Sequence, residues 1–175
     1  MSQTMHVMPV EESIDSQWAR FTQAGNEAFE RGDMREAQHY YEKAMAEAND
    51  MFDKAHTDPA ACQYAPMTYT IAAFNLAGLF SDIGDRQMMH RYARAGLERL
   101  VELADERSVP HALRVQCVRH LGRAVITLEE IYPAARTHPD YRVLVANADL
   151  LQRQFDTQAG LYSVPSASAR VAMVH

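Results

Sequence analysis

The sequence contains little cysteine, glycine or proline, and it has no long apolar run. Two cysteines, Cys62 and Cys117, are too few for a disulfide framework, and their spacing fits neither a metal knuckle nor a redox pair. The seven glycines and seven prolines fall mostly between periodic segments, which is typical of long helices joined by short turns. Nowhere do the roughly 18 consecutive apolar residues of a membrane span occur.

A basic excess is also missing, because the net charge is −6. The acidity lies in residues 1–66, which hold twelve acidic and five basic side chains. Nucleic acid and anionic membranes both require a basic face for nonspecific binding, so we expect neither as a partner. Residues 1–10 lack a positively charged start and an apolar run, and we therefore expect no secretory signal and a soluble cytoplasmic protein.

The most informative stretch, residues 18–48, predicts two helices folded back on each other. Apolar residues recur every three or four positions on both sides of the dipeptide Gly32-Asp33, which is the pattern of two amphipathic helices. Glycine can adopt the left-handed conformation that ends a helix, and aspartate can cap the helix that follows. The sequence between the two stripes therefore specifies a tight turn.

The pattern returns 52 residues later, around the dipeptide Gly84-Asp85. Two further apolar series with helical spacing cover residues 113–128 and 141–155. We expect breaks at residues 107–110 and 133–139, and a connector at residues 56–66, which contain two prolines. A helical start after Asp58 is an alternative within that connector.

These segments predict an all-α fold of about six main helices, arranged as three antiparallel hairpins stacked into a short α-solenoid. The first helix is expected to begin at Val10 or Ser13 and the second to end near Lys54. The helical domain would then span residues 10–160, between a flexible N-terminal segment at 1–9 and a flexible C-terminal tail at 161–175.

The hairpins share a repeated motif, which reads Phe21-x2-Ala24-Gly25-x2-Ala28 with Ala37-x3-Tyr41-x2-Ala44, then Ala73-x2-Leu76-Ala77-x2-Phe80, and Val118-x2-Leu121-Gly122-x2-Val125. This motif resembles the tetratricopeptide repeat (TPR), whose pattern is W-x2-L-G-x2-Y followed by A-x3-F. The repeat spacing of 52 residues exceeds the usual 34, so the repeats are atypically long. The resemblance implies a helical repeat protein whose first helices line a concave groove that binds peptides.

The resemblance also implies candidate peptide-binding residues. Asn26 and Asn75 occupy the positions of two asparagines that hold a peptide in carboxylate-clamping members of the family. An alternative is that Asn26 stabilises the packing of its own hairpin. At the basic positions of that clamp stand Thr22, Gln116 and His120, and we count the nearby Arg119 with these candidates, whereas Arg123 only lies close by.

Catalytic and metal-binding patterns are weaker than the repeat pattern. Glu36-x2-His39 matches one part of a di-iron ligand set and Asp53-x2-His56 resembles it, but the remaining ligands are missing, which favours solvated surface residues. Cys117 and His120 lie one helical turn apart, yet no third group would orient them, which favours a buried cysteine. We therefore expect no enzyme, metal site or cofactor.

The sequence thus favours a non-catalytic adaptor or chaperone with a protein or peptide partner. Two alternatives stay open at this stage. One is a small bacterial secretion-type TPR chaperone, and the other is a structural module that associates with its own copy as a homodimer.

Overall fold

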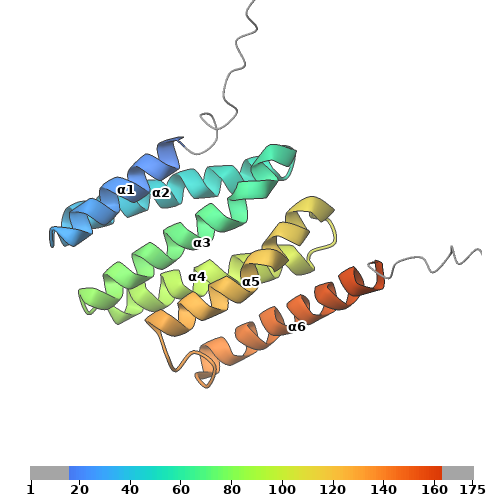
Figure 1. Cartoon of the computed structure of the whole chain (residues 1–175). Helices are drawn as coiled ribbons and strands as arrows, with labels where there is room; N and C mark the ends of the chain where they lie inside the picture. Colours follow the sequence, from blue (N-terminus) through green and yellow to red (C-terminus); the bar gives the residue numbers. More distant parts are fainter. Residues whose placement is uncertain (1–15, 163–175) are drawn as a thin grey trace, which may run out of the picture.

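The computed structural model describes residues 16–162, which form six α-helices and no strand. This order confirms the all-α fold of three hairpins (Figure 1). The predicted N-terminal segment and the possible helix start at residues 10–15 lie outside the described residues, as do residues 163–175 of the predicted tail. The helices are α1 (Ser16–Glu30), α2 (Met34–Ala55), α3 (Pro59–Asp82), α4 (Arg86–Asp105), α5 (His111–Ile131) and α6 (Pro139–Tyr162).

The two predicted glycine-aspartate turns have the same geometry. Gly32 and Gly84 adopt φ angles of +78° and +81°, in the left-handed region that side chains disfavour. Asp33 and Asp85 then accept a hydrogen bond from the backbone N–H three residues further on, at 3.0 and 3.1 Å. Each turn therefore ends one helix and caps the next with the same two residues.

Small residues allow α1 and α2 to approach closely. A Cβ atom on Gly25 would lie 2.5 Å from ring carbons of Tyr41 on α2. Ala37 and Ala44, one turn before and after Tyr41 on α2, are fully buried. The aromatic ring thus fills the space that the glycine leaves open.

The full connector expected at residues 56–66 is wrong, because only residues 56–58 separate α2 from α3, and the alternative of a helical start after Asp58 is confirmed. Asp58 caps α3 by accepting from the Ala60 N–H at 2.9 Å, and Pro59 occupies the first turn, where proline is tolerated. Pro66 lies inside the helix and is buried. Proline normally breaks a helix interior, but here tertiary burial of the whole segment overrides that local preference.

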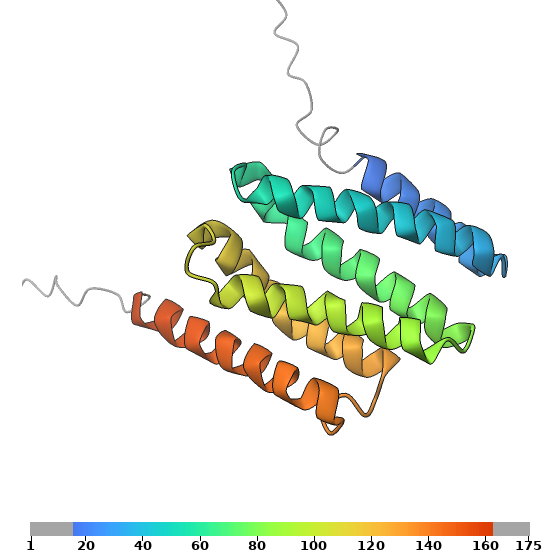
Figure 2. The ribbon, with the colours of Figure 1, turned by 180° about the vertical axis from the view of Figure 1, so that it is seen from behind.

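Helix α3 is the centre of the fold. It has no charged residue before Asp82, and it packs against α2, α4 and α5 but makes few contacts with α1. The labelled helices α1, α3 and α5 lie along the face seen in Figure 1. The view from behind, in Figure 2, shows α2 and α4 along the opposite face. The core therefore lies between two layers of helices.

Helix α6 closes the array by packing against α5 and α4. At its start an aromatic cluster joins three segments, and it consists of His90 on α4, Tyr132 and His138 around the α5–α6 loop, and Tyr141 on α6. The buried Tyr141 hydroxyl lies 2.8 Å from His90 Nδ1 and 3.1 Å from the His90 carbonyl. α6 extends two residues into the predicted tail, since it ends at Tyr162.

The turn glycines give the first testable prediction. Gly32→Ala should lower the free energy of unfolding by about 1 kcal/mol, because alanine is strained at positive φ. Gly78→Ala is the matched control, since Gly78 is helical and a Cβ there meets no atom within 4 Å. That control should stabilise the protein by up to about 1 kcal/mol. Urea unfolding measures both values, and equal effects of the two substitutions would contradict the turn assignment.

Candidate functional site

A single stripe of α3 stays partly open to solvent. Between residues 64 and 80, every α3 residue outside this stripe is buried. The stripe members are spaced three or four positions apart, as expected for one face of a helix, and they extend over about 21 Å at the rise of an α-helix. We call this set the α3 stripe, and its members are Tyr64, Met67, Ile71, Asn75 and Gly78.

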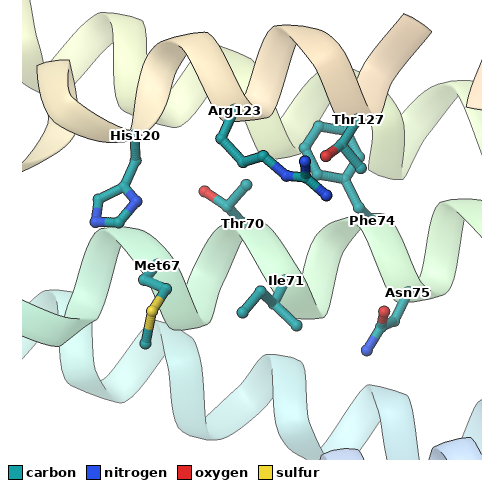
Figure 3. Close-up of a pocket in the computed structure, with 8 residues that line it drawn as sticks. All are labelled: Met67, Thr70, Ile71, Phe74, Asn75, His120, Arg123 and Thr127. Carbon is teal, nitrogen blue, oxygen red and sulfur yellow. The ribbon is translucent and has the colours of Figure 1, made fainter. Parts of the chain in front are cut away.

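A cavity of about 310 Å³ lies between the α3 stripe and α5. Its α3 wall is mainly apolar, whereas α5 contributes only polar and charged side chains. Figure 3 shows the three α5 side chains pointing from their helix towards α3. The lining consists of Met67, Thr70, Ile71, Phe74 and Asn75 from α3, and His120, Arg123 and Thr127 from α5.

The electrostatics of this cavity are dominated by one cation. Arg123 is exposed, and among residues 16–162 it forms no salt bridge. Burial, and to a lesser extent the nearby charge of Arg119, lowers the pKa of His120, so its imidazole is neutral at pH 7. The Thr70 hydroxyl already donates to the Pro66 carbonyl at 2.7 Å. The cavity therefore joins a mainly apolar α3 wall to one guanidinium group, that of Arg123, which has no salt-bridge partner among residues 16–162.

Two of the predicted peptide-binding residues, Asn75 and His120, line this cavity. The other four lie elsewhere in the described part of the chain. Thr22 and Gln116 are half-buried, and Arg119 is exposed on α5. Asn26 is also exposed, on α1.

Arg123 lines the cavity although the family comparison did not select it. The resemblance to clamp-type repeats placed Gln116 and His120 at the basic positions of the clamp, and it gave Arg123 only as a nearby residue. A signal for it is present in the sequence. His120, Arg123 and Thr127 are spaced three and four positions apart, so they share one face of α5.

Asn26 is engaged in the packing of its own hairpin. The Tyr41 hydroxyl donates to Asn26 Oδ1 at 2.8 Å, which links α1 to α2. This contact supports the alternative that Asn26 stabilises the packing of its own hairpin. Thr22, one turn earlier on α1, has a buried hydroxyl without a hydrogen-bond partner among the described residues.

The two cysteines are buried thiols. Burial raises the pKa of Cys117 to about 12, so it carries no thiolate at neutral pH and is a poor nucleophile beside His120. Cys62 donates from its Sγ to the Ala55 carbonyl at 2.9 Å. Both side chains therefore contribute to the core rather than to a reactive site.

The metal-ligand patterns do not converge in residues 16–162, where no group of three or more His, Cys, Asp or Glu side chains is placed to hold a metal ion. Glu36, from the best of those patterns, instead pairs with Arg31 at 2.7 Å. Nor does any helix of that region combine the length and hydropathy needed to cross a membrane.

Comparison with known proteins identifies one family. The model of the family described as "Protein of unknown function (DUF2753)" matches residues 16–159, which is nearly the whole helical array. No curated protein and no solved structure matches the chain.

A double-mutant cycle tests the structural role of Asn26. Asn26→Ala and Tyr41→Phe should each lower the free energy of unfolding by about 1 kcal/mol, because each removes the same interhelical hydrogen bond. The double variant should lose about as much as either single variant. Asn147→Ala, at an exposed position of α6, serves as the control and should have little effect. Fully additive losses would show that the two side chains do not interact.

The environment of His120 predicts a pH dependence of stability. Its pKa is lowered in the folded state, so the unfolded chain binds more protons as the pH falls below the unfolded value of about 6.5. The stability that neutral His120 contributes is therefore complete above about pH 6.5 and is lost as the pH falls below that value. His120→Gln should therefore reduce the difference in unfolding free energy between about pH 7.5 and about pH 5.5. An unchanged difference in urea titrations would refute this expectation.

Proposed function

The chain belongs to the DUF2753 family, and we propose that it is a non-catalytic protein-interaction module, an adaptor or chaperone, that binds a segment of a partner protein against the α3 stripe. The single observation that carries this proposal is the partly open, uncharged stripe in the centre of the array. A contiguous apolar surface with a few polar groups is the usual form of a peptide-binding groove.

The surroundings of the stripe support the same function. The cavity of about 310 Å³ can accept an apolar side chain of a partner. Asn75, His120 and Arg123 at its edge can orient that segment by hydrogen bonds or charge. The likeness of the hairpins to TPR motifs agrees with such a role. We place the protein in the cytoplasm, where buried free thiols such as Cys62 and Cys117 stay reduced.

One observation favours self-association as a second candidate function. Val143 and Leu150, two turns apart on α6, are 60% and 47% exposed at the end of the array. Terminal repeats of such arrays normally have polar outer faces. Exposed apolar side chains at this end therefore form a surface on which another copy can stack. A dimer that Val143→Lys dissociates would support this candidate.

Selection from a random peptide library displayed on phage tests the proposed function. Wild-type protein should enrich a family of related peptides. Met67→Lys should weaken their binding at least tenfold, because it places a charge on the apolar stripe. Val143→Lys makes the same kind of change on α6 and should leave binding unaffected.

Each variant should first be shown to retain the wild-type helix content and melting temperature. Failure to enrich any peptide, or enrichment of peptides that bind Met67→Lys as tightly as wild type, would refute the proposed site.

A further inference from the structure

We propose that the segment bound on the α3 stripe is an amphipathic α-helix, with acidic residues on the flank that faces α5. This inference rests on the proposed function, and it specifies the conformation and charge of the partner. Three features carry it. They are the shape of the stripe, the small number of hydrogen-bonding groups beside it, and the unpaired cation on α5.

The shape of the stripe suits a helix. The α3 stripe is a row of side chains at helical spacing, from Tyr64 to Gly78, and it extends over about 21 Å. About 14 residues of a second helix cover that length. α3 has extensive contact with α5 but little contact with α1. On the side that faces α1, the stripe is therefore not covered by a closely packed helix of residues 16–162. A partner helix can pack its own side chains into the α3 ridge there.

The hydrogen-bonding groups beside the stripe are too few for an extended peptide. About six residues in extended conformation would span the same length, and they would bring about twelve backbone N–H and C=O groups. The polar side chains that line the cavity are those of Asn75, His120, Arg123 and Thr127, together with the Thr70 hydroxyl, whose proton is already donated to the Pro66 carbonyl. A helix satisfies its own backbone groups internally and needs no such partners.

The charge of the surroundings defines one flank of the partner. α3 contributes no charge before Asp82, so the apolar face of the partner lies over an uncharged surface. Arg123 lines the cavity from α5, is exposed, and within residues 16–162 forms no salt bridge. A carboxylate on the α5-facing flank of the partner would pair with this guanidinium group.

Three synthetic peptides of about 18 residues test the proposal by fluorescence anisotropy with the full chain. The first has leucines at helical spacing and glutamates on one flank. The second replaces these glutamates with lysines, and the third is the first with a proline at its centre. The acidic helix should bind. The lysine peptide should bind about tenfold more weakly, and the proline peptide about 100-fold more weakly.

Charge reversal on the protein provides the second measurement. Arg123→Glu should remove or invert the preference for glutamate over lysine, because it replaces the cation at the edge of the cavity. Arg142→Glu is the matched control, since Arg142 is exposed on α6, and it should leave the preference unchanged.

The possible outcomes separate this inference from the proposed function. Absence of binding by the acidic peptide, equal binding of the proline peptide, or equal binding of the lysine peptide would each overturn the inference. If library peptides bind Met67→Lys more weakly than wild type but bind equally well with a proline at their centre, the proposed interaction module is retained and only the helical conformation of the partner is rejected. If the library also yields no binder, both proposals fail.

Discussion

The burial of α3 is the constraint on which the other packing in this protein depends. A helix of 24 residues without a charge before its last position cannot be left in water, and α2, α4 and α5 cover most of its surface. These three neighbours then need partners of their own. α1 packs on α2, and α6 packs on α4 and α5. The order of the helices in space follows from covering one apolar helix with its two neighbours in sequence, α2 and α4, and with α5.

The same constraint explains why the candidate site lies where it does. α1 contributes little to covering α3, so a narrow row of α3 side chains is only half-buried. Apolar side chains make up most of the α3 wall of the cavity, and the charged side chain in its lining is Arg123. An incompletely covered central helix is thus the surface on which the proposed partner segment would pack.

The features that the sequence predicts well are those that local chemistry determines. The two glycine-aspartate turns depend on a backbone conformation and a cap within a few residues, so Gly32 and Gly84 could be assigned directly. Pro66 shows the limit of that reasoning, because its position inside α3 depends on neighbours distant in sequence. The candidate site was predictable only in part for the same reason. Asn75 and His120 were found by motif position, whereas Arg123 required knowledge of which α5 face meets α3.

The aromatic cluster at the start of α6 has a consequence for motion within the array. Tyr141, Leu144, Val145 and Ala148 are the buried side chains of α6, and among the described side chains all later ones are half-buried or exposed. Attachment of the helix is therefore concentrated in its first three turns, next to His90. Amide hydrogen exchange should follow that gradient, with protection falling along α6 from Tyr141 onwards, so that its far end frays while the first turns remain docked.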